Sequence, residues 1–230
     1  MQALRQAVSQ AHAELDRRSA AYLRTLALQP SCRKGCYFCC YALVMIGLAE
    51  AEYLRENLSP ERLAQVEQTG RERLRQIARG KHRPNFATSY FLQANPCPLL
   101  TEDGACSAHA HRPLACRGVL TDLDAHYCTP GAVLNLRGRA KDDYEDQLRS
   151  YHGPEHYLKT PWLLSEQTAQ GLWETEQKVR GFTVIGELAT LVYLRGQDDF
   201  QTALRLGPEA TRRYLQRLSL LGGDWGFWVG

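Results

Sequence analysis

The chain has 230 residues, of which 44% are hydrophobic, and its 28 Lys and Arg side chains nearly balance 25 Asp and Glu, giving a formal net charge of +3. This length and apolar content suffice for one sizeable domain or two small ones with a buried core. The charge balance gives no broad positive field of the kind that binds DNA or RNA, so we expect no nucleic-acid partner.

The first residues alternate charged and apolar side chains, so they lack the apolar stretch of a secretory signal. The longest apolar run, residues 42–49, is too short to cross a bilayer. We therefore expect a cytoplasmic protein with no membrane association. Cytosolic thiols are kept reduced, so the eight cysteines are expected to be metal ligands or catalysts rather than disulfide partners.

Hydrophobic residues recur at helical spacing in the first third of the chain. The pattern predicts an amphipathic helix over residues 4–26. Residues 40–57 contain no proline and consist of good helix formers, so they predict a half-buried helix that begins at the cysteines. Ser59 and Pro60 then supply an N-cap and a proline at the first helical position. They predict a third helix that runs to about Arg79.

The stretch from Gly80 to Arg137 is rich in Pro, Gly, Asn, Asp and Cys and follows neither the helical nor the strand period. An irregular segment of this length is uncommon in a compact domain unless function or a crosslink orders it. A bound metal would provide that order.

Helical character returns beyond this stretch. Residues 183–193 also favour a buried strand, but one isolated strand is hard to place, so a helix is preferred there. The tail, 222–230, carries two tryptophans and is expected to dock on the body as a core anchor. No internal repeat is expected. The predicted helices of this half cover 140–151, 162–180, 182–194 and 208–221.

Together these patterns predict a mainly α fold. We expect a single helical domain over 1–230, with a long irregular, cysteine-rich central region over 32–128 that a metal site organises.

The first cysteine group places four thiols in a C-x3-C-x2-C-C arrangement at Cys32, Cys36, Cys39 and Cys40. Thiols two residues apart can turn back on one ion or cluster because the backbone between them forms a tight loop, and Gly35 would ease the turn. Successive side chains diverge in most backbone geometries, so Cys39 and Cys40 are not both expected on one small ion. We expect one of the two cysteines to lie next to the metal ligands without binding the metal, to be a redox-active thiol, or simply to be buried.

The second group begins at Cys97 and Cys106, which flank a Glu-Asp-Gly turn that would bring the two thiols together. Cys116 and Cys128 follow in the next short loops.

These residues resemble the CxxCxxCC family of zinc- or iron-chelating domains, often described as iron–sulfur-cluster-containing proteins. The resemblance spans roughly Cys32 to Arg117 and includes a Cys-Pro-Leu step at Cys97 and a Cys-x5-Arg-Pro-x2-Cys-Arg motif that begins at Cys106. The chain departs from the pattern at His109, where an aromatic residue is expected, and in a first spacing that is one residue longer. The resemblance implies metal chelation.

The family motif contains Arg112 and Arg117, which we expect to contact the bound group through charge-assisted hydrogen bonds. For Arg33 and Lys34 a solvated cation is equally compatible. His109, His111 and His126 are alternative ligands, although a hydrogen-bonded surface histidine is the commoner case. The pair His152 and His156 is discounted because Gly153 and Pro154 would break a helix between them. The expected metal ligands are drawn from Cys32, Cys36, Cys39, Cys40, Cys97, Cys106, Cys116 and Cys128.

A 4Fe-4S cluster is favoured over zinc as the cofactor. Zinc prefers paired two-residue spacings that close two knuckles, and only Cys36 and Cys39 fit that rule. A cluster accepts ligands from scattered loops, such as those of the second group. Whether the eight thiols form one site or two is left open, the best single site being the first group with one or more of Cys97, Cys106 and Cys116.

The expected function is a metal-binding protein with a redox or metal-handling role, whose partner is the metal ion or cluster itself. One alternative is a zinc-stapled interaction module with a protein partner. Another is a cluster-dependent enzyme, because flagellin lysine methylases are similar over the cysteine region. The chain is short for that class and has no glycine-rich cofactor loop.

Overall fold

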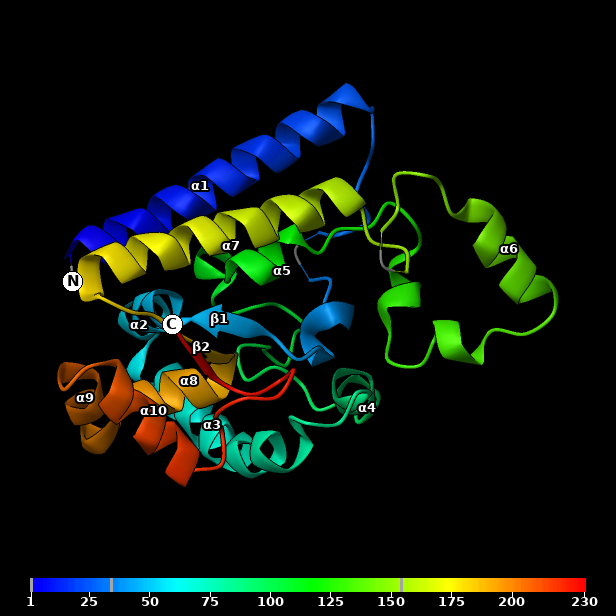
Figure 1. Ribbon diagram of the computed structural model, residues 1–230. Helices are drawn as coiled ribbons and strands as arrows, with labels where there is room; N and C mark the ends of the chain where they lie inside the picture. Colours follow the sequence, from blue (N-terminus) through cyan, green and yellow to red (C-terminus); the bar gives the residue numbers. More distant parts are fainter. Residues whose placement is uncertain (1, 34, 154) are drawn as a thin grey trace.

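Two long helices lie side by side along one face of the molecule (Figure 1). The structure, a computed structural model, describes residues 2–33, 35–153 and 155–230. Helix α1 spans Gln2–Thr25 and α7 spans Lys159–Arg180, and the two pack against each other. Both lie where the sequence predicted helices. The buried residues of α1 recur at three- or four-residue spacing and form one face of the helix: Leu4, Val8, His12, Leu15 and Ser19.

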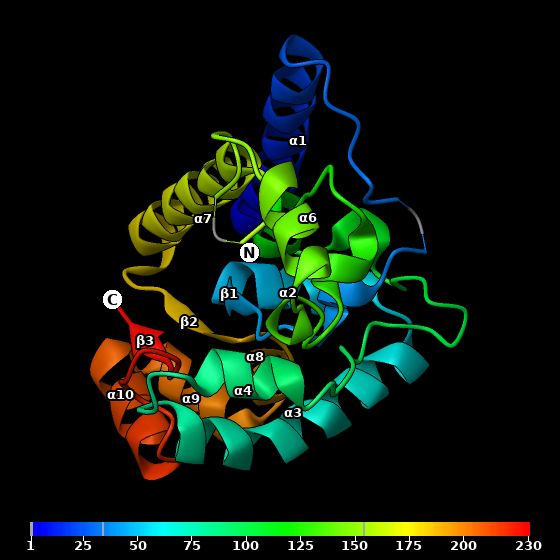
Figure 2. The same cartoon turned by 90° about the vertical axis from the view of Figure 1, so that its right-hand side faces the viewer.

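A small antiparallel sheet lies between the helical layers (Figure 2). It consists of β1 (Met45–Gly47), β2 (Val184–Glu187) and β3 (Trp228–Val229), in the order β1-β2-β3. The helices predicted for 40–57 and 182–194 are therefore wrong over their first residues. The strand propensity of the second segment prevails because β2 is not isolated, since its two partners come from distant parts of the chain.

Strands β1 and β2 each lead directly into a helix, α2 (Leu48–Asn57) and α8 (Leu188–Arg195). The first eight residues of these helices, LAEAEYLR and LATLVYLR, are identical at five positions. Ile46 and Gly186 occupy equivalent places in the two copies and pair directly in the sheet. The two strand–helix units are thus an internal repeat about an approximate two-fold axis through that pair, and the expectation of no repeat was wrong.

Contacts between the two copies are reciprocal. The guanidinium of Arg55 donates to the carbonyl of Val192 at 2.8 Å, and that of Arg195 donates to the carboxylate of Glu52 at 2.7 Å. Positions 52 and 192 are equivalent in the repeat. The axis therefore relates the contacting residues, although one acceptor is the backbone carbonyl of Val192 and the other is the carboxylate of Glu52.

The opposite face is built from α3 (Pro60–Gly80), α9 (Asp198–Arg205) and α10 (Pro208–Arg217). Helix α3 is confirmed at its predicted start, where the Ser59 hydroxyl accepts from the Arg62 N–H at 3.3 Å. Helix α3 packs closely on α8, because a Cβ at Gly70 would lie 2.0 Å from the carbonyl oxygen of Ala189. Helix α9 was not predicted.

Apart from β1, α2 and α3, the described part of the cysteine-rich region over 32–128 contains only short helices, joined by turns. Helix α6 (Arg139–Gln147) follows it and projects from the body (Figure 1). The mainly helical fold with an irregular centre is confirmed. The short elements are η1 (Phe38–Tyr41), α4 (Phe86–Leu92), η2 (His109–His111), α5 (Leu114–Gly118), η3 (Ala125–Cys128) and η4 (Val133–Asn135).

The C-terminal tail docks on the body as predicted, with Gly230 bonded to Thr183 by backbone hydrogen bonds in both directions. Phe227 is its core anchor, at 1% exposure, whereas Trp228 is 49% exposed. Among the helices of the described chain, none has the length and apolar character needed to span a bilayer.

Candidate metal centre

The first cysteine group is shaped by two tight turns. Gly35 has φ of 88°, the left-handed conformation that glycine adopts without strain, and Cys36 N–H bonds the Arg33 carbonyl at 2.9 Å. The role predicted for Gly35 is confirmed. The 3₁₀ helix η1 then carries Cys39 and Cys40, with Cys40 N–H on the Tyr37 carbonyl at 2.9 Å.

Cys97 and Cys106 are held beside the first group by backbone bonds. Cys97 N–H donates to the carbonyl of Cys40 at 2.7 Å, and Leu100 pairs with Cys106 as an isolated antiparallel bridge. Gly104, with φ of 77°, turns the chain between them. This is the Glu-Asp-Gly turn that the sequence predicted would bring Cys97 and Cys106 together.

Cys116 lies on α5 and Cys128 on η3. The start of α5 is fixed by a buried hydrogen bond from Leu114 N–H to the carboxylate of Glu50 at 2.9 Å. The two 3₁₀ helices η1 and η3 contact each other, which brings Cys128 to the first group.

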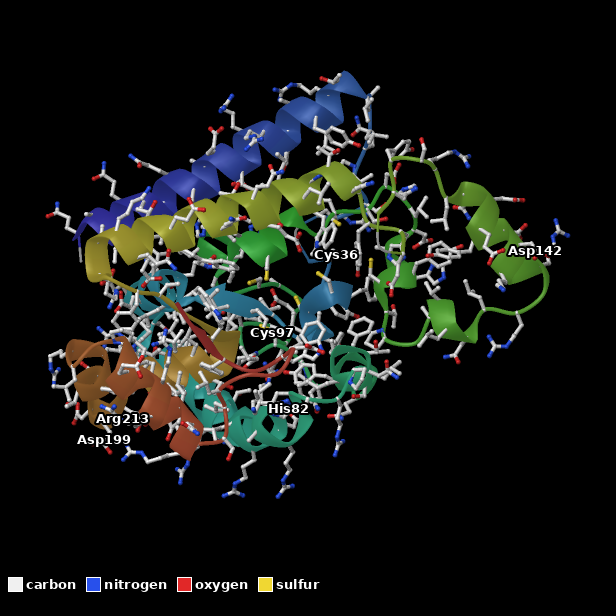
Figure 3. All side chains as sticks on the ribbon, viewed as in Figure 1. Cys36, His82, Cys97, Asp142, Asp199 and Arg213 are labelled. Atoms are coloured by element: carbon white, nitrogen blue, oxygen red, sulfur yellow. The ribbon has the colours of Figure 1, made fainter. Side chains whose placement is uncertain are left out.

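All eight cysteines are free thiols, and Cys128 is buried while the others are half-buried. Sulfur atoms gather in the middle of the molecule between the labelled Cys36 and Cys97 (Figure 3). Burial raises the pKa of Cys97 to about 11 and of Cys128 to about 12, and neighbouring thiols contribute to both shifts. Such thiols deprotonate readily only when a cation binds, because the metal–thiolate bond offsets the unfavourable free energy of a buried thiolate.

The neighbours Cys39 and Cys40 share a thiol–thiol hydrogen bond. That bond lowers the pKa of Cys39, because Cys40 acts as the donor to a Cys39 thiolate, and it raises the pKa of Cys40. The pair is therefore polarised, with the negative charge favoured on Cys39.

Arg112 is a cation whose charge acts on several of these thiols. Its positive charge lowers the pKa of Cys39, Cys106 and Cys116, although burial outweighs it for the latter two. The Nε atom of Arg112 is buried and has no hydrogen-bond partner within the described chain. A buried donor without an acceptor is costly, so its place beside the thiols fits a bound anionic centre.

Arg117 contacts protein groups instead. Its guanidinium donates to the carbonyls of Arg112 at 2.8 Å and Ala110 at 2.6 Å, and pairs with Asp16 of α1 at 2.5 Å. These bonds fix the loop that carries Arg112 and tie it to α1.

His156, which sequence reasoning had discounted, lies at the edge of the thiol cluster. It is fully buried, with Nε2 3.1 Å from the sulfur of Cys128 and Nδ1 3.3 Å from the hydroxyl of Tyr144. Burial lowers its pKa to about 4, so it is a neutral partner of Cys128. In the sequence, His156 was considered only as one of two ligands on a helix turn with His152, whereas in the structure His156 contacts Cys128, which is distant in sequence.

The other histidines have protein partners. His152 bonds Asp122 at 2.7 Å, His111 lies 3.2 Å from the Tyr53 hydroxyl, and the exposed His126 lies beside Asp124. His109 lies 3.3 Å from Arg112. Over the described residues, no three His, Cys, Asp or Glu side chains stand close enough together to hold a single metal ion. The thiols are gathered, but more widely than one ion requires.

The fold and the site define a mainly helical protein with cysteines gathered around an irregular centre. Residues 31–130 match the model of the CxxCxxCC family, described as a "putative zinc- or iron-chelating domain". The match confirms the resemblance found in the sequence and supports cysteine-ligated metal binding. No curated protein and no solved structure matches the chain.

Proposed function

We propose that this protein is an iron–sulfur protein, with its cysteine-rich region over 32–128 holding a 4Fe-4S cluster within a single domain. The proposal is supported by eight free thiols from four separate segments and by the buried Nε of Arg112, which has no hydrogen-bond partner among the described residues. Thiolate ligands are what iron–sulfur clusters require, and Arg112 supplies a positive charge to the anionic assembly.

The spacing of the thiols favours a cluster over a zinc ion. One zinc ion would draw four sulfurs to within about 2.3 Å of a single point. Among the described residues no such group of three is present. A cluster holds its thiolates at separate corners and therefore accepts a wider set.

When bound, a cluster supplies one-electron redox chemistry. The buried surroundings would limit access of water to it, and His156 would donate or accept a hydrogen bond at the sulfur of Cys128. We therefore propose a redox or metal-handling role in the cytoplasm, with the cluster as the bound partner.

Anaerobic purification tests the proposal. We expect brown protein with iron and acid-labile sulfide and a broad visible absorbance that oxidation removes. Colourless protein with stoichiometric zinc would instead support the zinc-stapled module.

Single substitutions test the ligands. Cys36→Ser should reduce the metal content and the melting temperature together. Ser107→Ala is the matched control, because the Ser107 hydroxyl lies in the same region and donates to the Leu99 carbonyl, and this variant should leave the metal content unchanged. An unchanged iron content in the Cys36 variant would remove that residue from the ligand set.

A further inference from the structure

A cavity of about 750 Å³ lies between α7, α5 and the residues that lead into β1. Its volume is in the range of small-molecule sites, which commonly lie between packed helices. Cys39 and Cys116, two of the expected metal ligands, lie on its wall. A molecule bound in this cavity would therefore lie beside the thiol cluster.

The walls of the cavity are fixed by close packing. A Cβ at Gly118 of α5 would lie 2.4 Å from the Cβ of Ser165, so α5 and α7 touch directly at this point. A Cβ at Gly47, the last residue of β1, would lie 2.8 Å from the Cδ1 atom of Trp173. Neither position has room for a side chain, so these two sides of the cavity are in place before any ligand arrives.

Aromatic side chains form much of the lining. Three of the four tryptophans of the chain line the cavity, together with Tyr157. Trp162 and Trp173 come from α7, and Trp225 comes from the C-terminal tail. The backbone N–H of Trp225 donates to the carbonyl of Lys81 at 3.3 Å, which holds this part of the tail in place. The face of an aromatic ring is partially negative and attracts cations.

Glu166 places a carboxylate between two of these rings. It follows Trp162 by four residues and precedes Trp173 by seven, and both spacings return to the same face of a helix. With a rise of about 1.5 Å per residue, Glu166 is about 6 Å from Trp162 and about 10 Å from Trp173 along the axis of α7. The Glu166 carboxylate makes no hydrogen bond or ion pair with any residue that the structure describes. It is therefore available to pair with a ligand.

The lining presents no basic side chain that would repel a cation. Among the described lining residues Glu166 is the charged one, and none is Lys, Arg or His. The charge of Arg112 acts on Cys39 and Cys116, but Arg112 does not line the cavity. An anionic ligand would find no partner of opposite charge in this lining, whereas an organic cation would find a carboxylate and aromatic faces.

We propose that this cavity binds an organic ammonium ion, a cation with apolar substituents, between Glu166 and the tryptophans of α7. The ring faces attract the cation, and the carboxylate supplies the opposite charge. The substituents would contact the aliphatic part of the lining, which includes Leu43 and Val44. Binding depends on these side chains and not on the identity of the metal.

The position of the cavity connects this ligand to the metal centre. A metal held by Cys39 or Cys116 would lie behind the same wall, a step that rests on the proposed function. A cluster or a zinc ion bound by four thiolates has a net charge of about −2, which would attract the cation further. The ammonium compound is thus a candidate substrate or effector of that centre.

Equilibrium dialysis of natively purified protein at about pH 6.5 tests the ligand class. The probe is 3-hydroxyphenyltrimethylammonium, whose ammonium group has a permanent charge and no N–H. In its neutral isostere, 3-tert-butylphenol, carbon replaces the ammonium nitrogen. We expect saturable binding of one cation per chain, with an affinity at least about tenfold higher than that of the isostere. Equal affinities, tighter binding of the isostere or no saturable binding would each overturn the proposal.

Glu166→Gln tests the opposite charge. Glu166 is exposed and the amide has the same size, so the fold should be unaffected. We expect the cation to bind about threefold or more weakly and the neutral isostere to bind as in wild type. Glu145→Gln is the matched control, because Glu145 is an exposed helical glutamate of α6 outside the lining. Equal cation affinity in the two variants would place the cation elsewhere and overturn the assignment.

Trp162→Leu tests the aromatic wall. Leucine keeps the wall apolar but removes the ring face, so the variant should lose more affinity for the cation than for the isostere. Trp228→Leu is the control, because Trp228 is 49% exposed and is the tryptophan outside the lining. Wild-type affinity for the cation in both variants would contradict the aromatic contact. If Trp162→Leu fails to fold, the two probes on wild type and the Glu166 variant still decide.

The results for the cavity and for the metal can be separated. Protein that lacks iron but prefers the cation as expected would contradict the proposed function and leave the cavity assignment standing. Iron-loaded protein that binds neither probe would contradict the cavity assignment and leave the proposed function standing.

Discussion

Arg112 and Arg117 belong to the same short segment but have different surroundings. The buried Nε of Arg112 has no acceptor among the residues that the structure describes, and its charge acts on the thiols, whereas Arg117 is bonded to carbonyls and to Asp16. Under the proposed function, Arg112 would stabilise a bound anionic centre and Arg117 would position the loop that carries Arg112.

Arg112→Ala should make the centre easier to dismantle. Removing a charge-assisted interaction costs roughly 1.5–3 kcal/mol, which corresponds to at least about tenfold faster metal loss. The measurement is the rate of iron release to a chelator under anaerobic conditions. Arg139, whose side chain is 94% exposed, provides the control Arg139→Ala, and equal rates for the two variants would contradict the role of Arg112.

Glu176 should make stability depend on pH. Burial raises its pKa from 4.5 to about 7, and Glu52 raises it further, while Thr183 and Arg180 oppose the shift. The folded state thus binds the proton more tightly than the unfolded state, so this contribution is complete below pH 4.5 and is lost as pH rises through about 7. The loss is on the order of 3 kcal/mol.

Denaturant unfolding of wild type and Glu176→Gln between pH 4.5 and 8 measures this effect. The amide stays neutral, so the variant should gain stability relative to wild type as pH rises. Parallel pH profiles would show that Glu176 is not protonated in the folded state.

At this scale the sequence predicted a set of candidate ligands but not the directions of their side chains. The cysteine spacing identified all eight thiols that the structure gathers. The different roles of Arg112 and Arg117, and the contact of His156 with Cys128, depend on tertiary packing. The spacing of residues along the chain does not show which group from a distant segment a side chain will contact.

At the scale of elements, amphipathic periodicity located α1, and capping residues or a proline located the starts of α3 and α7 to within a few residues. It failed where a strand of three or four residues leads into a helix, as at β1 and β2. Such strands are too short to show the two-residue hydrophobic alternation of a strand, and they form because they pair with each other in the sheet. The repeat in α2 and α8 was the signal that could have revealed them.

Two helical glycines should respond in opposite ways to substitution by alanine, because Gly70 lies at the contact of α3 with α8 and Gly171 of α7 faces open space. Gly70→Ala places a Cβ 2.0 Å from the Ala189 carbonyl oxygen, so it should destabilise the fold by about 2 kcal/mol or more. Gly171, also within a helix, has nothing within 4 Å of such a Cβ, and Gly171→Ala should stabilise by roughly 0.5–1 kcal/mol. Chemical denaturation measures both changes, and a neutral Gly70 variant would contradict the close packing of the two helices.

At the scale of the whole molecule, two helical layers are joined by an irregular region in which most of the cysteines lie. The layers have their own apolar clusters, one around Leu54 and Phe200 and one around Val8 and Leu15. The central stretch has little regular structure, and under the proposed function its order would depend on the metal that its cysteines hold.

Removal of the metal should therefore loosen the centre more than the layers. Hydrogen exchange of chelator-treated protein should show strong loss of protection over 97–128 and little change in α3 and α8. Equal loss of protection throughout would show that the metal supports the entire fold, and no loss would show that the centre is ordered without it.

The most direct test of the central claim is X-ray absorption of anaerobically purified protein at the iron and zinc edges. The account predicts an iron edge whose first shell is sulfur and whose second shell is iron. A zinc edge with four sulfur neighbours and no iron, or a metal bound by oxygen and nitrogen alone, would contradict it.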